Sequence, residues 1–217
     1  MTRVQVAGIS NLADALACEA AGVDAIGFTI GLPTGPHNGL DEAGAAAIVR
    51  ALPPFVVPVL ITYRVTAAEV VPLCRELGLN QVQLHAPAEP AEMLRMREAV
   101  PGLKLILAVN VTGEDALAVA AGRAAYADAI ILDTYDPATG RHGATGKTHD
   151  WAISRRIVEQ CPRPVILAGG LNPANVAEAI RHVRPWAVDV HTGVENADGS
   201  TNHDRIRAFV AAARVAG

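Results

Sequence analysis

Short apolar runs alternate along the whole chain with Ala-rich stretches of helical length. Each apolar run is bounded by Gly, Pro or polar residues, as is typical of strands that are buried on both faces of a parallel sheet. The predicted strands are Val4–Ala7, Asp24–Ile30, Val56–Thr62, Gln81–His85, Leu103–Val109, Ala129–Asp133, Val165–Ala168 and Ala187–His191.

Capping residues and prolines predict where the intervening helices begin. Ser10 is the expected N-cap of the first helix, and Asn172-Pro173 predicts a cap followed by proline at the first helical position. Pro72 is expected to kink or shorten its helix, and the last helix is predicted to begin near His203. Further predicted N-caps are Asp41, Thr66 and Asp150.

Eight strands that alternate with helices point to an α/β fold of repeated βα units. Eight equivalent units in 217 residues favour a single-domain (β/α)8 TIM barrel over residues 1–217, rather than an open doubly wound sheet. No GxGxxG motif follows the first strand, which argues against a dinucleotide site, and no cofactor is expected.

Composition narrows the function classes. Apolar residues make up 51% of the chain and aromatic residues 4%, which suits a parallel sheet wrapped by Ala-rich helices. The net charge of −4 without a basic stripe gives no support to a nucleic-acid or membrane partner. The cysteines form no CxxC pair and the histidines are scattered, so neither a disulfide framework nor a metal site is predicted. The N-terminus reads as a strand rather than a signal peptide, and a cytoplasmic setting is expected.

Three strand ends carry the candidate chemistry, at residues 131–133, 167–173 and 189–195. In a (β/α)8 barrel the strand ends face the active site, and the loops after the seventh and eighth strands often bind phosphate. Asp133 is therefore a candidate acid or base, although it could be a solvated strand-end carboxylate. The predicted phosphate-binding residues, which could also be plain turn residues, are Gly146, Gly169, Gly170, Thr192 and Gly193.

In these segments the chain resembles the phosphoribosylanthranilate isomerases, barrel enzymes of tryptophan biosynthesis. The resemblance covers nearly the whole length and implies a phosphorylated small-molecule substrate. The matching segments are Gly22–Phe28, Gln81–His85, Ile131–Asp133, Gly143–Gly146 with Asp150-Trp151, Leu167–Leu171 with Pro173 and Asn175-Val176, and Asp189-Val190 with Gly193–Glu195.

The resemblance implies an Amadori rearrangement, in which a general acid opens the sugar ring and a general base removes the C2 proton. The family's acid corresponds to Asp133. Its base is a cysteine that corresponds here to Ala7, whose methyl group cannot accept a proton, and its nearby lysine corresponds to Gln5. Losing a positioned base costs about 10²–10⁴ in rate. The arginine that holds the anthranilate carboxylate has no counterpart in residues 33–38.

Other polar residues at the predicted mouth could replace the missing groups. His85 and His191 both end strands, and either could act as the base, although a lone histidine is more often structural. Arg64 stands where the family commonly has asparagine, and it could bind a substrate anion or be a surface arginine. Four charged or titratable residues of the sixth loop are expected to lie in a solvated loop, although they could also belong to a mobile lid; these are Arg141, His142, Lys147 and His149.

Three hypotheses follow. The first is an isomerase of this family with Asp133 as acid and a substitute base, which is His85, His191 or water. The second keeps the chemistry but changes the phosphorylated sugar or amine, because the second loop and Arg64 differ from the family. The third is a non-catalytic ligand-binding barrel, which Ala7 supports. The oligomeric state does not follow from the sequence.

Overall fold

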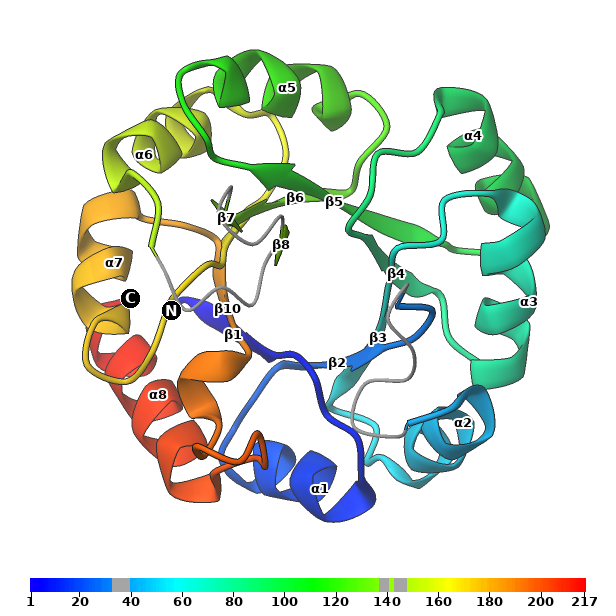
Figure 1. Ribbon diagram of the computed structural model, residues 1–217, viewed down its shortest axis with the longest axis horizontal. Helices are drawn as coiled ribbons and strands as arrows, with labels where there is room; N and C mark the ends of the chain where they lie inside the picture. The colour runs from blue at the N-terminus through cyan, green and yellow to red at the C-terminus, as the bar shows by residue number, and fades with distance from the viewer. Residues whose placement is uncertain (33–39, 137–140, 143–147) are drawn as a thin grey trace.

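Eight parallel strands close into a barrel whose axis is nearly along the view in Figure 1. The computed structural model describes residues 1–32, 40–136, 141–142 and 148–217. Around the barrel the strand order is β1-β10-β9-β6-β5-β4-β3-β2. These strands are β1 (Arg3–Val6), β2 (Ala25–Thr29), β3 (Val57–Thr62), β4 (Gln81–Leu84), β5 (Lys104–Asn110), β6 (Ala129–Asp133), β9 (Val165–Leu167) and β10 (Ala187–Val190). The predicted (β/α)8 barrel is confirmed.

Helices form the outer ring in Figure 1 and connect consecutive barrel strands. A small antiparallel pair, β7 (Tyr135–Asp136) and β8 (Arg141–His142), belongs to the connection after β6. The helices are α1 (Leu12–Ala20), α2 (Glu42–Ala51), α3 (Ala67–Leu77), α4 (Pro90–Ala99), α5 (Asp115–Ala124), α6 (Trp151–Gln160), α7 (Val176–Val183) and α8 (His203–Ala216). No helix in the described ranges is both long and apolar enough to cross a membrane.

Two hydrophobic clusters divide the core between the inside of the barrel and the layer under the helices. Because successive strand residues point to opposite faces, Val59 and Ile61 join the smaller cluster while Leu60 joins the larger one. The smaller cluster also contains Ile131 and Ile166 and several alanines. Both faces of each strand are therefore covered, which explains why the strands read as continuous apolar runs.

Most predicted helix starts are confirmed, and two are wrong. Asp41 and Asp150 accept hydrogen bonds from backbone N–H groups in the first turns of α2 and α6, and Thr66 forms a capping box with Glu69. The cap of α1 is Asn11 rather than Ser10, because its side chain accepts from Asp14 N at 2.9 Å. The last helix begins at His203, as predicted.

Proline has a different effect from the predicted one at two positions. Pro72 does not shorten α3, which continues to Leu77, since Val71 and Leu73 on either side of the proline are buried in the core. The helix predicted from Asn172-Pro173 begins only at Val176. Asn172 instead caps a turn, in which its Oδ1 accepts from Ala174 N at 2.9 Å.

Candidate active site

The carboxyl ends of the eight barrel strands meet at one end of the barrel, so the residues that follow them share one mouth. Asp133 is the last residue of β6 and is only 5% exposed. Its Oδ1 accepts a 2.7 Å hydrogen bond from the backbone N–H of Thr134. Burial and then the Asp133 charge raise the pKa of Tyr63, which follows β3. The carboxylate therefore acts electrostatically across the mouth rather than facing bulk solvent.

His85 follows β4 and is held by neighbours on two sides. Its ring stacks on Tyr63 with centroids 5.2 Å apart and planes inclined by 15°. Gln5 Nε2 donates to Gln83 Oε1 at 2.8 Å, and Gln83 Nε2 lies 3.0 Å from His85 Nε2. Because the Gln83 amide nitrogen donates, Nε2 of His85 accepts, and the neutral ring carries its proton on Nδ1.

His191 follows β10 and lies against the end of β1. A Cβ at position 8 would overlap the imidazole of His191, so Gly8 gives the ring the space it occupies. Gly8 directly follows Ala7 at the end of β1. His191 Nε2 also lies 3.1 Å from Glu195 Oε1, and both side chains are mostly buried. The ring of His191 therefore lies at the end of β1, with the Glu195 carboxylate beside it.

Asp189 lies inside the barrel, one strand position below the mouth. It pairs in register with Gln5, whose side chain hydrogen bonds to it. Its Oδ1 is buried and has no hydrogen-bond partner among the described residues. Burial, followed by the charge of Asp133, raises the pKa of Asp189 to about 7. Asp189 was not among the predicted site residues, although the presence of an aspartate within an apolar strand could have indicated it.

The turns after β9 and β10 lie against each other. Gly169 and Gly170 have φ angles of +79° and +65°, a left-handed region that favours glycine. A Cβ at position 193 would overlap the carbonyl oxygen of Leu171, so only glycine fits between the two turns. Thr192 and Gly193 belong to the short helix η2 (Thr192–Val194). Within the described part of the chain, the backbone N–H groups of Gly170 and Gly193 have no hydrogen-bond acceptor.

The structure thus brings together four of the five predicted phosphate-binding residues, and the fifth, Gly146, lies outside the described residues. The neighbouring His149 is not the solvated loop residue expected from the sequence. Its Nδ1 lies 3.2 Å from Thr134 Oγ1 and its Nε2 lies 2.7 Å from Ser154 Oγ. Burial lowers the pKa of His149 to about 4, so the ring is neutral near pH 7.

Arg64 follows β3 and reaches over the end of β2. A Cβ at Gly31 would lie 2.7 Å from Arg64 Nε, and the guanidinium Nη2 is 3.4 Å from Glu42 Oε1. Both members of this ion pair are about one-third exposed, at 35% and 34%, so it holds Arg64 only weakly. Among the described residues, no cluster of three His, Cys, Asp or Glu side chains could hold a metal ion.

Comparisons with known proteins agree with this arrangement. A family model described as N-(5'-phosphoribosyl)anthranilate (PRA) isomerase matches residues 7–212. A relative named N-(5'-phosphoribosyl)anthranilate isomerase from Methanocella arvoryzae is 40% identical over 215 residues, covering 99% of each chain. Another from Methanosarcina mazei, named N-(5'-phosphoribosyl)anthranilate isomerase 2, is 39% identical and covers 96% of this chain and 92% of its own length.

Solved structures of the same family superpose on the whole barrel. Phosphoribosyl anthranilate isomerase from Thermotoga maritima matches with a TM-score of 0.86 and 34% identity over 99% of this chain and 100% of its own. A phosphoribosyl anthranilate isomerase in complex with reduced 1-(o-carboxyphenylamino)-1-deoxyribulose 5-phosphate matches with a TM-score of 0.83 and 32% identity, over 99% of this chain and 100% of its own. The chain belongs to the N-(5'-phosphoribosyl)anthranilate isomerase family.

Proposed function

We propose that this barrel isomerises phosphoribosylanthranilate to its ketose form in tryptophan biosynthesis, with Asp133 as general acid and His191 as general base. Family membership supports the reaction. The observation that carries the assignment of the base is the imidazole of His191 lying over Gly8, directly beside Ala7. The second and third hypotheses, another phosphorylated substrate and a non-catalytic barrel, are not favoured by the comparisons.

The reaction begins with opening of the ribose ring. Asp133 gives a proton to the ring oxygen as the bond from that oxygen to C1 breaks, and the nitrogen lone pair forms a C=N bond to C1. His191 then removes the proton from C2, which yields an enol with the amine restored. The enol then collapses to the ketone as His191 returns its proton to C1 and the proton of the C2 hydroxyl passes to Asp133, which regenerates both groups. Each proton transfer contributes about 10²–10⁴ in rate.

The contact between Gln83 and His85 favours His191 over His85 as the base. Nε2 of His85 accepts from the Gln83 amide, which places the ring proton on Nδ1. In His191 the Nε2 atom is the ring atom nearest Gly8 and lies 3.1 Å from Glu195 Oε1, so a ring protonated there would pair with that carboxylate. Glu195 is therefore proposed as a positioning residue that also stabilises the imidazolium.

The phosphate group is proposed to bind where the turns after β9 and β10 meet. The N–H groups of Gly170 and Gly193 would donate to its oxygens, with Gly169 and Thr192 shaping the turn. Gly146 remains part of this proposal. Arg64 is proposed to hold the carboxylate of the anthranilate, since it reaches the end of β2 from which the family's arginine is missing.

Turnover of freshly generated phosphoribosylanthranilate, followed by fluorescence at high enzyme concentration, tests the proposal. Asp133→Asn and His191→Gln should each lower kcat by about 10²–10⁴, and His85→Gln should lower it less. Adding Ala7→Cys to His191→Gln should restore part of the rate. No turnover by the unmodified protein would rule out the proposed reaction.

Two further tests separate binding from chemistry. Arg64→Met should raise KM with little change in kcat, because the carboxylate lies away from the reacting carbons. A larger effect on kcat than on KM would contradict this role. We also propose that residues 1–217 act as one domain in a cytoplasmic setting, and a single cooperative unfolding transition is expected.

A further inference from the structure

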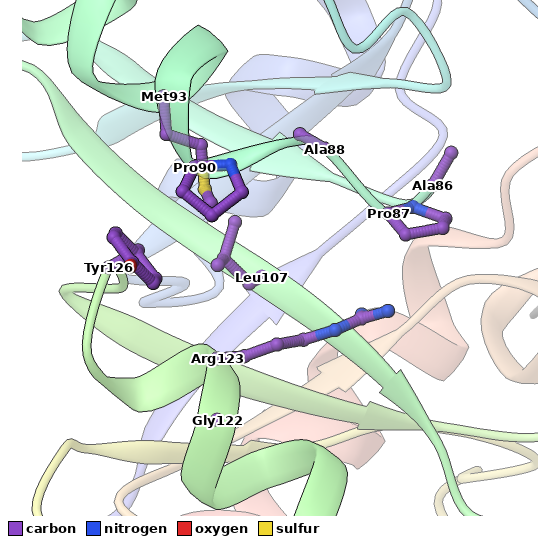
Figure 2. A pocket seen from close by; sticks show the side chains of 9 residues that line it. All are labelled: Ala86, Pro87, Ala88, Pro90, Met93, Leu107, Gly122, Arg123 and Tyr126. Atoms are coloured by element: carbon purple, nitrogen blue, oxygen red, sulfur yellow. The ribbon is translucent and has the colours of Figure 1, made fainter.

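A cavity of about 140 Å³ lies outside the barrel, behind the segment that follows His85. It is bounded by that segment, by β5, and by α4 and α5 (Figure 2). Its walls are mainly apolar and include Pro87, Pro90, Met93 and Leu107, and Arg123 and Tyr126 add polar surface. It contains none of the residues assigned to the isomerisation.

Arg123 of α5 is the charged residue of this cavity. Figure 2 shows its side chain running from α5 past Leu107, with the guanidinium toward the side formed by Ala86 and Pro87. Burial lowers the pKa of Arg123, so the guanidinium is partly removed from water. Among the described residues no carboxylate forms an ion pair with it and no acceptor takes a hydrogen bond from its side chain.

The neighbouring Arg97 shows how a guanidinium group in this region is paired with hydrogen-bond acceptors and a carboxylate. Arg97 donates to the backbone oxygens of Leu103 and Tyr126 and pairs with Asp128 at 2.7 Å. Arg123 lacks equivalent partners in the described part of the chain, although its charge is desolvated. A desolvated cation without a counter-ion is costly, and an anion placed against it recovers that free energy.

The volume of the cavity and the residues that line it indicate which kind of ligand it fits. An enclosed apolar cavity of about 150 Å³ holds one benzene ring, so this pocket of about 140 Å³, which is open on one side, has room for a group of that size. Beside the guanidinium the walls offer apolar surface rather than further cations, which suits a single carboxylate better than a phosphate dianion. A planar carboxylate also matches the guanidinium fork in bidentate geometry.

We propose that this cavity binds an aromatic monocarboxylate of benzoate size, with its carboxylate on Arg123 and its ring against Met93, Pro90 and Leu107. The ligand site is separate from the barrel mouth. The segment from Ala86 to Ala88 forms one wall and continues directly from His85, so an occupant would lie behind the rim of the active site. The cavity walls supply no nucleophile or acid, which makes this a binding site rather than a second reaction centre.

Titration calorimetry of the full-length protein with benzoate, benzamide and inorganic phosphate tests the proposal. Benzoate should bind at least about tenfold more tightly than either of the others, because benzamide lacks the charge and phosphate lacks the ring. Arg123→Met should weaken benzoate binding at least about tenfold, and Arg123→Lys should weaken it less. Ala88→Phe, which keeps the arginine but fills the cavity, should also abolish binding.

Two control variants test where the aromatic ring of benzoate binds. Arg95→Met removes an exposed arginine of α4, and Arg64→Met removes the proposed carboxylate anchor at the mouth. Neither should change the affinity of the benzoate site that Arg123→Met weakens. Benzoate binding that is lost with Arg64→Met but kept with Arg123→Met would put the ring in the barrel mouth and overturn the proposal, as would no binding at millimolar benzoate. Because affinity is the readout, the result is independent of turnover.

Discussion

Replacing Asp189 by Asn removes an ionisable group that the fold buries beside a second carboxyl group. Asp189 Oδ1 has no partner among the described residues, and the hydrogen bond from Gln5 offsets only part of the burial. Burial and the charge of Asp133 raise the pKa of Asp189 from 3.8 to about 7. The folded state therefore keeps a proton that the unfolded state releases at a much lower pH.

The sign of the effect follows from proton binding in the two states. Between pH 4 and pH 7 the folded protein binds more protons at Asp189 than the unfolded chain, so this residue lowers stability as pH rises. Below the unfolded pKa both states are protonated, and above the folded pKa both are ionised, so the effect is confined to this window. A carboxyl pKa raised from 3.8 to about 7 corresponds to about 4 kcal/mol, at about 1.4 kcal/mol per tenfold change in proton affinity.

Urea unfolding at a series of pH values from 4 to 8 measures the effect. The free energy of unfolding of Asp189→Asn minus that of the unmodified protein should increase by up to about 4 kcal/mol over this range. Other titrating groups occur in both proteins and cancel in the difference. Gln5→Lys should reduce the increase, because a neighbouring cation favours the ionised carboxylate.

Asp128→Asn is a control of opposite sign. Burial alone would raise the pKa of Asp128, but hydrogen bonds from Leu105 N and Arg97 lower it overall. The stability that Asp128 contributes is therefore lost only as pH falls below about its unfolded value of 3.8, so its variant difference should decrease as pH rises through that region and stay nearly constant from pH 4 to pH 8. A difference for Asp189→Asn that stayed constant from pH 4 to pH 8 would refute the reasoning about its burial.

Three other perturbations have defined outcomes. Because burial lowers the pKa of His149 to about 4, the unmodified protein should lose up to about 3 kcal/mol of stability relative to His149→Gln as pH falls from 6.5 to 4, measured by urea unfolding. Gly193→Ala should lower the thermal midpoint strongly because its Cβ would overlap Leu171 O, whereas Gly122→Ala on exposed α5 should stabilise by about 0.5–1 kcal/mol. Pro72→Ala should raise the free energy of unfolding by about 1–3 kcal/mol, since the exposed proline lacks the N–H that α3 needs, and a loss would contradict this.

The barrel could be predicted because each of its strands and helices is indicated by residues that are close together in the sequence. The alternation of apolar runs with capped helical stretches located all eight barrel strands to within two residues at each end. Caps such as Asp41 and Asp150 were also visible, because the residue and the N–H it binds are close in sequence. The prediction of Ser10 as the N-cap was wrong because Asn11, one position later, has a side chain that accepts a hydrogen bond from Asp14 N.

The interior of the site could not be predicted in the same way. Gln5 and Gln83 are 78 residues apart, and nothing local to either indicates their contact. His191 was a candidate from its strand end, but its place against Gly8 depends on the pairing of β1 with β10 that closes the barrel. The sequence therefore predicted which strand ends carry chemistry, and the closure of the barrel determined which side chains meet.

The side-chain amides of Gln5 and Gln83 form a hydrogen-bonded chain across the barrel that ends at His85. Each contact in this chain has a defined donor and acceptor. Gln83 uses its carbonyl oxygen toward Gln5 and its amino group toward the imidazole, so neither amide can relay a proton without turning over by half a revolution. Such a turn would break two buried hydrogen bonds at the same time. The fixed orientation of the two amides therefore prevents the transfer of a proton along this network between His85 and Asp189.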